Sequence, residues 1–220
     1  MVRALVDLVL PTECGGCREP GTPWCAGCAA ELDSEPVPVR TRVDGVPPAW
    51  ATGAYTGARR AVVVAAKERG RRDLLVHVGR AWARCLRDLR DWGELDPPEL
   101  AALHLVPAPS RARAARQRGG DPVLAAARVC AAHLGGSTTV APVLGLRRGV
   151  RDSVGLTAGQ RVDNLHGRVR VRPGALPPPG SAVVLLDDVL TTGATAAASA
   201  SALRDCGIRV HAVLVLAAVR

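Results

Sequence analysis

The amino-acid sequence predicts an α/β protein with a parallel sheet, preceded by a small N-terminal module held together by four cysteines. Two observations support this prediction. Strand patterns alternate with helical patterns over residues 49–220, which is typical of a parallel sheet, and four of the seven cysteines fall within residues 14–28. The chain has 220 residues, of which 48% are hydrophobic and 22% charged. This composition excludes a disordered tail or a collagen-like rod, and the absence of phenylalanine predicts a core of alanine, valine and leucine.

Composition divides the chain into three parts. Residues 1–35 hold the clustered cysteines, with six acidic and two basic side chains. Residues 36–48 carry prolines at both ends and are expected to form a semi-rigid linker, and residues 49–220 form the main domain. Because the whole chain has a formal net charge of +9, its basic surplus lies outside the cysteine module.

The sequence predicts no membrane segment and no signal peptide. Residues 2–10 are apolar but include Arg3 and Asp7, and they are far shorter than the ~20 residues that span a bilayer. They also lack the small-residue cleavage site of a signal peptide. Cysteines in Cys-x-x-Cys pairs are typical of metal binding in a reducing compartment, so we expect a cytoplasmic protein.

The elements of the main domain follow from their apolar patterns. Helices are expected where apolar residues recur every three or four positions, at residues 58–68, 74–92, 122–134 and 195–206. The third helix follows Asp121, a good N-cap residue, and has Pro122 in its first turn. Strands are expected where apolar residues run on, at residues 103–107, 138–144, 182–187 and 210–216. The polar, glycine-rich residues 145–160 have the composition of a mobile lid or, alternatively, of a surface loop.

The clustered cysteines predict a metal site. Two Cys-x-x-Cys pairs offer the ligand set of a closed, structural zinc ion, and the four ligands are Cys14, Cys17, Cys25 and Cys28. Four thiolates also hold iron–sulfur clusters, so that alternative stays open. Such a metal would hold together a segment too short to fold by apolar burial alone. The other three cysteines fall in expected helices and are interpreted as core residues: Cys85, Cys130 and Cys206.

The most specific pattern is the run Val-Val-Leu-Leu-Asp-Asp-Val-Leu-Thr-Thr-Gly-Ala-Thr at residues 183–195. Its apolar residues indicate a buried strand, and Asp187 and Asp188 follow at the carboxyl end, where ligands bind in open α/β sheets. The next turn opens a helix and offers N–H groups, hydroxyls and a helix dipole to a phosphomonoester. The residues of this turn are Thr191, Thr192, Gly193, Ala194 and Thr195. The two carboxylates suit ribose hydroxyls and hydrated Mg²⁺. An acidic strand end before an ordinary helix cap is the simpler alternative, which the length of the run disfavours.

A basic region follows the strand at residues 103–107. Its turn consists of Pro107, Ala108, Pro109, Ser110 and Arg111, and three further arginines follow by residue 118. Because guanidinium groups bind phosphate oxygens in pairs, this turn is a candidate pyrophosphate pocket; a basic solvated loop is the alternative. Lys67 is the only lysine of the chain. It is a candidate for contact with pyrophosphate or, alternatively, an ordinary cation at a helix C-terminus.

The combination of these motifs resembles the ComF family, competence-associated proteins with a type I phosphoribosyltransferase domain. The elements that carry the resemblance are the cysteine spacing, the Val-Pro-Ala-Pro-Ser run at 106–110, Arg147 and Arg148 with Gln160 and Asn164, and the run at 187–195. The resemblance covers nearly the whole chain. The family's usual Arg-Gly-Phe-Asn-Gln segment departs here to Arg-Gly-Gly-Asp-Pro at residues 118–122.

The resemblance implies a phosphoribosyltransferase-like fold that binds phosphoribosyl diphosphate (PRPP) and Mg²⁺. Asp187 and Asp188 would hold the ribose hydroxyls, directly or through Mg²⁺, and the turn at 191–195 would hold the 5-phosphate. The turn at 107–111, with Lys67, would hold the pyrophosphate. Phosphoribosyl transfer to a base or amine needs no protein nucleophile, only positioning, charge neutralisation and exclusion of water.

Two functions other than catalysis stay open. Family members with assigned roles serve DNA uptake and are linked to single-stranded DNA and a helicase partner, so a non-catalytic DNA- and partner-binding protein is the main alternative. The basic main domain favours it, whereas the scarcity of aromatic residues disfavours it, and the acidic module is poorly suited to a phosphate backbone. A PRPP-sensing regulator is the third interpretation. The fold commonly forms homodimers.

Overall fold

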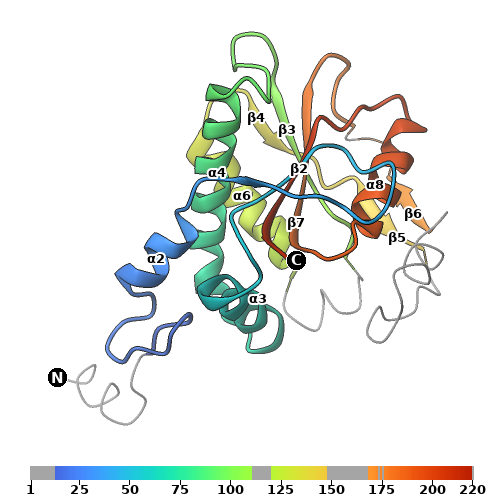
Figure 1. The fold of residues 1–220 in the computed structure, drawn as a ribbon. Helices are drawn as coiled ribbons and strands as arrows, with labels where there is room; N and C mark the ends of the chain where they lie inside the picture. Colours follow the sequence, from blue (N-terminus) through green and yellow to red (C-terminus); the bar gives the residue numbers. More distant parts are fainter. Residues whose placement is uncertain (1–12, 111–119, 148–167, 173, 175, 220) are drawn as a thin grey trace.

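The computed structural model describes residues 13–110, 120–147, 168–172, 174 and 176–219. Its centre is a six-stranded sheet in the order β1-β2-β8-β7-β3-β4 (Figure 1). The strands are β1 (Val37–Pro38), β2 (Ala49–Ala51), β8 (Ala212–Ala218), β7 (Ala182–Leu190), β3 (Leu103–Pro107) and β4 (Thr138–Val140). All neighbours are parallel except β1, which runs antiparallel to β2. The predicted α/β class with a mostly parallel sheet is therefore confirmed.

The two most apolar strands, β7 and β8, lie in the middle of the sheet. Residues 182–186 and all of β8 are buried, as expected for parallel strands covered on both faces. β7 is longer than predicted, because its pairing with β8 continues to Leu190 opposite Ala218. The strand expected at residues 182–187 thus extends three residues further, and Asp187 and Asp188 lie inside it, which corrects their expected place at its carboxyl end.

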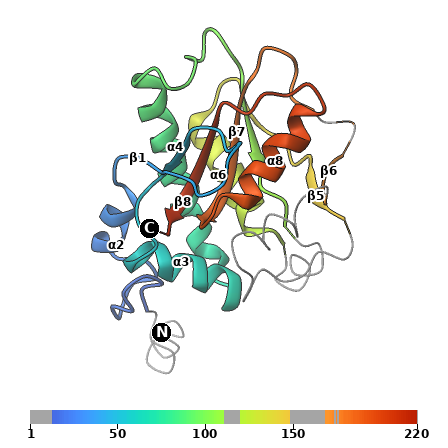
Figure 2. The same cartoon turned by 45° about the vertical axis from the view of Figure 1, so that its right-hand side comes forward.

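Helices cover both faces of the sheet. α3 (Gly57–Glu68), α4 (Leu75–Asp91) and α6 (Pro122–Leu134) belong to one side, and α8 (Ala194–Arg204) lies on the other (Figures 1 and 2). The buried residues accordingly form two clusters, which are built mainly from alanine, valine and leucine as predicted. All four expected helices are present. None of the helices in the described ranges is long and apolar enough to cross a membrane.

The prediction of a single strand at residues 138–144 is wrong in its length. β4 ends at Val140, and β5 (Leu144–Leu146) pairs antiparallel with β6 (Val169–Val171) in a separate two-stranded sheet. Pro142 lies between them and has no N–H group to continue a ladder. The first residues of the expected lid thus belong to β5, and residues 148–160 lie outside the described part of the chain.

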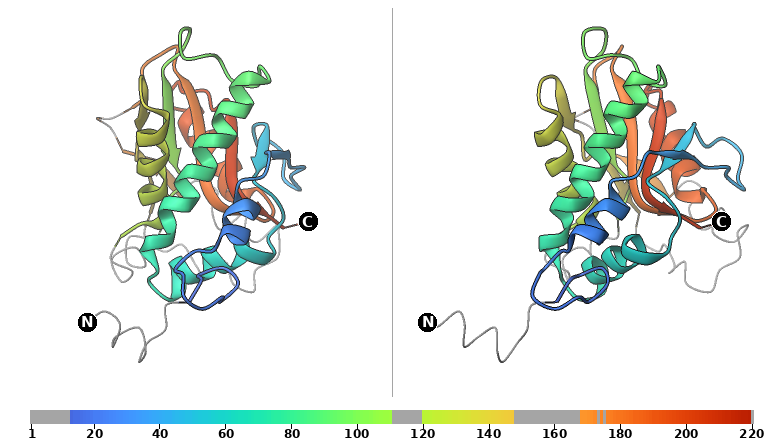
Figure 3. Two further views of the ribbon diagram at one scale, coloured as in Figure 1. Left: turned by 90° about the vertical axis from the view of Figure 1, so that its left-hand side faces the viewer. Right: turned by 60° about the vertical axis from the view of Figure 1, so that its left-hand side comes forward.

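The N-terminal module packs directly against the main domain. Its helix α2 (Ala26–Leu32) lies beside α3 and α4 (Figure 3). Cys28 and Leu32 belong to the same buried cluster as the inner residues of those two helices. The ring of Trp24 also stacks on His77 of α4, with 5.0 Å between the centroids. Module and main domain therefore share one core.

Gly79 allows α4 and α6 to pack closely. A Cβ atom at this position would lie 2.6 Å from the backbone oxygen of Ala126 and 2.6 Å from the Cβ of Val129. We therefore expect Gly79→Ala to destabilise the protein by about 1–3 kcal/mol, although alanine has the higher helix propensity. Gly27→Ala in α2 is the matched control and should be neutral or slightly stabilising, because the nearest atom would lie 4.0 Å away. Urea unfolding measures both changes, and equal stabilities would contradict this account of the helix contact.

Candidate functional site

The carboxyl ends of β3 and β7 bring two of the singled-out segments together. Pro107 pairs with Leu186 in the parallel ladder, and the N–H of Ala108 donates to the carbonyl of Leu186 over 2.7 Å. The turn at residues 107–110 therefore begins beside Asp187. Arg111 and the arginines that follow it by residue 118 lie outside the described residues.

Asp121 belongs to this site in a way that its sequence pattern did not indicate. One carboxylate oxygen caps α6 as predicted, accepting from the N–H groups of Val123 and Leu124 at 2.9 and 3.2 Å. The other oxygen accepts a hydrogen bond from Ser110 Oγ at 2.5 Å. Asp121 thus ties the turn after β3 to the start of α6. No local pattern could reveal this contact, because it joins two separate loops.

The last turn of α3 places Lys67 at the same edge of the sheet. Its Nζ lies 2.5 Å from Oδ2 of Asp188, while 41% of the lysine side chain stays exposed. Burial would lower the pKa of Lys67, but the charge of Asp188 and then that of Asp187 hold it above its ordinary value. Lys67 is therefore a charged partner of the aspartate pair, and more than a cation at a helix end.

The carboxyl group of Asp187 titrates close to neutrality. It is half-buried, and its Oδ1 accepts a hydrogen bond from the backbone N–H of Asp188 at 2.8 Å. Burial, followed by the charge of Asp188, raises the pKa of Asp187 to about 7, although Lys67 acts in the opposite direction. A ligand that binds here therefore meets a site whose charge changes near neutral pH.

This raised pKa predicts a pH-dependent stability. Between the ordinary pKa of about 4 and about 7, Asp187 is protonated in the folded chain and ionised in the unfolded chain. The folded chain therefore binds one proton more than the unfolded chain in this window, and the free energy of unfolding falls as the pH rises through it. The free energy of unfolding of Asp187→Asn lacks this fall, so the stability of the variant relative to the wild type should be greater at pH 8 than at pH 4.5. Urea unfolding at the two pH values measures this gain, and an unchanged difference between variant and wild type would contradict the raised pKa.

The turn at residues 191–193 leads from β7 directly into α8. Gly193 has a left-handed backbone (φ 93°) and stands at the N-cap position of α8, which has no side-chain cap. Thr192 is buried, and its Oγ1 accepts a hydrogen bond from the N–H of Ala194 at 3.3 Å. Thr191 is exposed and Thr195 partly so. One N–H group of the first turn of α8 is therefore bound within the turn itself, and the hydroxyl-bearing residues Thr191 and Thr195 beside it are open to solvent.

The linker is also part of this region, which the sequence analysis missed. The N–H of Arg42 donates to the carbonyl of Thr192 over 3.2 Å, and a Cβ on Gly193 would lie 3.0 Å from Cγ2 of Val46. The lack of a side chain at Gly193 thus leaves room for residues 36–48 to approach this turn closely. Residues 36–48 also supply the two-residue strand β1, which pairs with β2, so this segment contacts the main domain at β1 as well as at Gly193.

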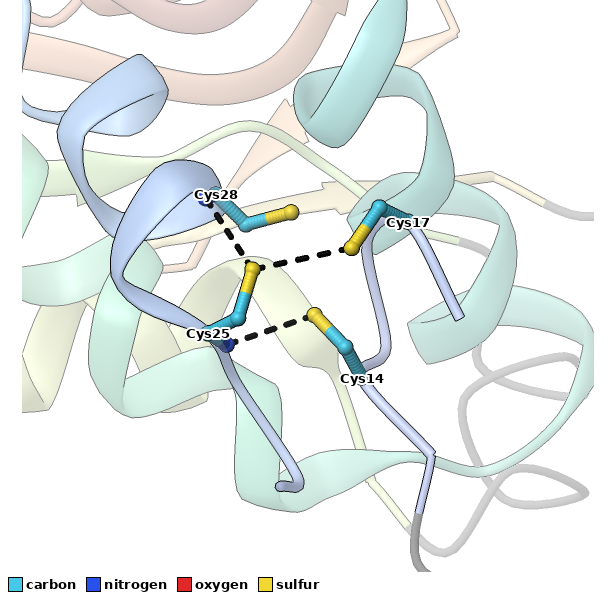
Figure 4. A group of neighbouring side chains, drawn as sticks. All are labelled: Cys14, Cys17, Cys25 and Cys28. Carbon is cyan, nitrogen blue, oxygen red and sulfur yellow. Dashed lines mark hydrogen bonds between the residues drawn. The ribbon is translucent and has the colours of Figure 1, made fainter. Parts of the chain in front are cut away.

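The four cysteines of the module converge on one point (Figure 4). Each offers one sulfur, and the four sulfur atoms lie within 4.8 Å of one another. The Sγ atoms of Cys17 and Cys25 are 3.6 Å apart, and none of the four is in a disulfide. The predicted four-cysteine cluster near the N-terminus is therefore confirmed.

Backbone N–H groups point at these sulfurs. Gly16 and Cys25 donate to Cys14 Sγ at 3.4 and 3.3 Å, and Cys28 donates to Cys25 Sγ at 3.4 Å. Burial tends to raise the pKa of the Cys14 thiol, but these N–H groups lower it to about 6. Burial and the neighbouring sulfurs raise the pKa of the Cys28 thiol, and the pKa of Cys25 is raised as well. Of these three cysteines, only Cys14 is therefore favoured by its surroundings as the thiolate, the form that binds metal.

The remaining cysteines divide into two kinds. Cys85 in α4 and Cys130 in α6 are fully buried, and burial raises the pKa of each thiol to about 12, as expected of inert core residues. Cys206 is exposed, so its interpretation as a core residue is wrong. α8 ends at Arg204, and the turn that Gly207 closes leaves Cys206 in solvent.

The fold and the site define the chain as an α/β protein with a mostly parallel sheet, an acidic pair within the carboxyl-terminal half of its central strand and a four-cysteine cluster near the N-terminus. No protein-family model matches this chain, and no curated protein matches its sequence.

Proposed function

We propose that this chain is a ComF-like member of the type I phosphoribosyltransferases, which binds PRPP at the edge formed by β3, β7 and the start of α8. One observation supports this most. The aspartate pair, the lysine that neutralises it and the turn at residues 107–110 come from three separate segments, yet they lie at one edge of the sheet. Ligands of open α/β sheets bind at this edge.

Each part of the site has a role in this proposal. Asp187 and Asp188 accept hydrogen bonds from the ribose hydroxyls, and the loop at 191–195 holds the 5-phosphate through N–H groups, hydroxyls and the α8 dipole. Lys67 and the turn at 107–111 neutralise the pyrophosphate as its bond to the anomeric carbon breaks. Because no protein nucleophile is needed, these groups accelerate transfer to a base or amine by positioning and charge stabilisation.

The aspartates suit Mg²⁺ in part. Carboxylate oxygens are ligands that Mg²⁺ prefers, but Oδ2 of Asp188 is already bound to Lys67. We therefore propose that Asp187, whose carboxylate is not paired with Lys67, is the residue that would hold Mg²⁺ if the ion binds together with PRPP. Bound in this way, Mg²⁺ would neutralise charge on the leaving pyrophosphate.

We also propose that the cysteine cluster holds one structural zinc ion. Tetrahedral zinc lies about 2.3 Å from each sulfur, which puts the sulfurs about 3.8 Å apart. The Cys17–Cys25 separation of 3.6 Å fits this spacing. Four sulfurs within 4.8 Å of one another enclose a single ion more readily than a cluster of several iron and sulfide atoms, so the spacing favours zinc over iron–sulfur.

Ligand-induced stabilisation tests the PRPP site. A ligand at a hundred times its dissociation constant stabilises a protein by about 2.7 kcal/mol. We expect PRPP with Mg²⁺ to raise the melting temperature of the full chain, and ribose 5-phosphate or pyrophosphate alone to raise it less. Equal melting temperatures with and without saturating PRPP would contradict the proposal.

A second candidate function rests on a different surface. A hollow of about 390 Å³ between the cysteine module and α3 is lined by Arg18, Arg60, Arg69 and Arg71. Arg71 is paired with Asp73, whereas the other three guanidinium groups have no hydrogen bond or ion pair within the described ranges. The module contributes Arg18 and the acidic Glu13 to this hollow, and the other three arginines come from α3 and the residues that follow it. Its net positive charge favours contact with the phosphates of single-stranded DNA.

Salt dependence tests this second candidate. Labelled single-stranded DNA should bind with an affinity that falls steeply with salt, and Arg60→Gln/Arg69→Gln should reduce that slope by about 2. Arg87→Gln/Arg128→Gln is the matched control, because both arginines are exposed on other helices. Equal slopes for the two double variants would exclude the hollow as a DNA site.

A further inference from the structure

Helix α3 connects the cysteine module to the candidate ligand site. It starts beside Glu31, the acidic residue near the end of α2, and its last turn carries Lys67. Nine residues separate Ala58 from Lys67, so these two points are about 14 Å apart along a rigid helix. Because the helix is rigid, a contact at the first turn of α3 can affect the position of Lys67 in its last turn.

Glu31 holds this first turn in place of an ordinary cap. Thr56 is the N-cap residue but makes no side-chain capping bond. Instead, both oxygens of the Glu31 carboxylate accept from the N–H of Ala58, at 3.0 and 3.1 Å. A Cβ at Gly57, where φ is +50°, would lie 2.6 Å from Oε1 of Glu31. A carboxylate at the positive end of the helix dipole is stabilising, and here it comes from the module.

Arg59 extends this contact into the sheet. Its Nη1 lies 3.3 Å from Oε1 of Glu31. Its Nη2 donates to Ser34 Oγ at 2.9 Å and also to the backbone carbonyl of Glu31, so Arg59 makes three contacts with the end of the module. Its Nε donates to Thr52 Oγ1 at 3.0 Å, and that hydroxyl donates to the carbonyl of Leu216 in β8 at 2.6 Å. Arg59 is buried (7% exposed). A buried charge is costly to leave unpaired. The contacts of Arg59 therefore hold the module, α3 and the sheet in fixed positions relative to one another.

We propose that Glu31 is a positioning residue, which acts through α3 to hold Lys67 against Asp188, so that the cysteine module sets the geometry of the ligand site. The role of Lys67 toward a ligand rests on the function proposed above, but the contact itself does not. The apolar residues of α3 pack against the core in any case. The competing account is therefore that this packing alone places Lys67 and that Glu31 is dispensable for it.

The single lysine makes the contact measurable without any ligand. Lys67 is the only lysine side chain in the protein, so an amine-specific acylating reagent at pH 8, read by peptide mass spectrometry, reports on it alone. Only the deprotonated amine reacts, and its fraction rises about tenfold when the pKa falls by one. The titratable groups that act on Lys67 are Asp188, Asp187 and Tyr55.

The experiment compares four forms of the full-length, metal-loaded protein. Asp188→Asn removes the partner and should accelerate acylation about tenfold, and Glu31→Gln should accelerate it about threefold or more with the metal content unchanged. Glu35→Gln is the matched control, an exposed carboxylate of the same module, and should behave as the wild type. The ¹³Cε shift of the lysine, followed against pH, provides a second readout.

The outcomes separate this inference from the proposed function. A folded Glu31→Gln protein with unchanged lysine reactivity would overturn the inference, whether or not PRPP binds. If that variant does not fold, Glu31→Asp, which shortens the reach by one methylene, takes its place in the comparison, and unchanged reactivity there would overturn the inference in the same way. Faster acylation of Glu31→Gln, together with a wild type that does not bind PRPP, would support the positioning role of Glu31 and refute the proposed PRPP site.

Discussion

Cys28→Ser is expected to release the metal and to unfold the N-terminal module. A structural zinc site contributes about 10–16 kcal/mol of apparent binding free energy, which is as large as the whole stability of a typical domain, about 5–15 kcal/mol. Cys28 is buried, and it belongs to the same hydrophobic core as the buried residues of α3 and α4. The loss should therefore spread beyond the module and lower the melting temperature of the main domain.

Metal content and thermal unfolding measure this effect together. The wild type should carry one equivalent of zinc, and Cys28→Ser should carry much less and melt at a clearly lower temperature. Cys206→Ser is the matched control, because Cys206 is exposed and lies outside the cluster; it should retain both the metal and the stability. A Cys28→Ser protein that melts like this control would show that the cluster is not a structural metal site.

Asp187→Asn/Asp188→Asn is expected to weaken PRPP binding by about a hundredfold or more. A hydrogen bond to a charged group contributes about 1.5–3 kcal/mol, and the change removes the charge of both acceptors proposed for the ribose hydroxyls. It also removes the ionic partner of Lys67, so the lysine loses the contact that holds it at the site. Equilibrium dialysis with labelled PRPP and Mg²⁺ measures the affinity.

The control for this prediction is Asp91→Asn/Asp205→Asn. Both aspartates are exposed. Asp91 is the last residue of α4, and Asp205 is the C-cap of α8, at the opposite end of that helix from the turn at 191–195. This double change alters the net charge of the protein equally and should leave PRPP affinity unchanged. A similar loss in both double variants would mean that overall charge determines binding, and not the pair in β7.

Local chemistry explains why much of the fold was predictable. β3 has the predicted bounds because Pro107 ends an apolar run, and α6 has them because Asp121 and Pro122 form a strong helix start. The four cysteines were predictable from spacing alone, since two Cys-x-x-Cys pairs have few structural solutions. In each case the signal and the structure that it specifies lie within a few residues of each other.

Contact between distant segments is the physical cause of several of the errors and omissions. Asp187 and Asp188 looked like residues beyond a strand end, but pairing with β8 keeps them in the ladder. The linker looked like a spacer, yet Val46 packs against Gly193. Glu31 carried no recognisable motif, because its role arises from the N–H of Ala58, 27 positions away. Such partners are determined by tertiary packing and leave no local pattern.

Calorimetric titration of the metal-loaded protein with PRPP and Mg²⁺ tests the central claim most directly. The account predicts saturable binding with a stoichiometry near one, which is lost in Asp187→Asn/Asp188→Asn and weakened when Mg²⁺ is removed. The accepting base or amine would then be sought by screening for pyrophosphate release. A well-folded wild type that gives no binding heat at several temperatures would contradict the claim and leave contact with nucleic acid as the remaining candidate function.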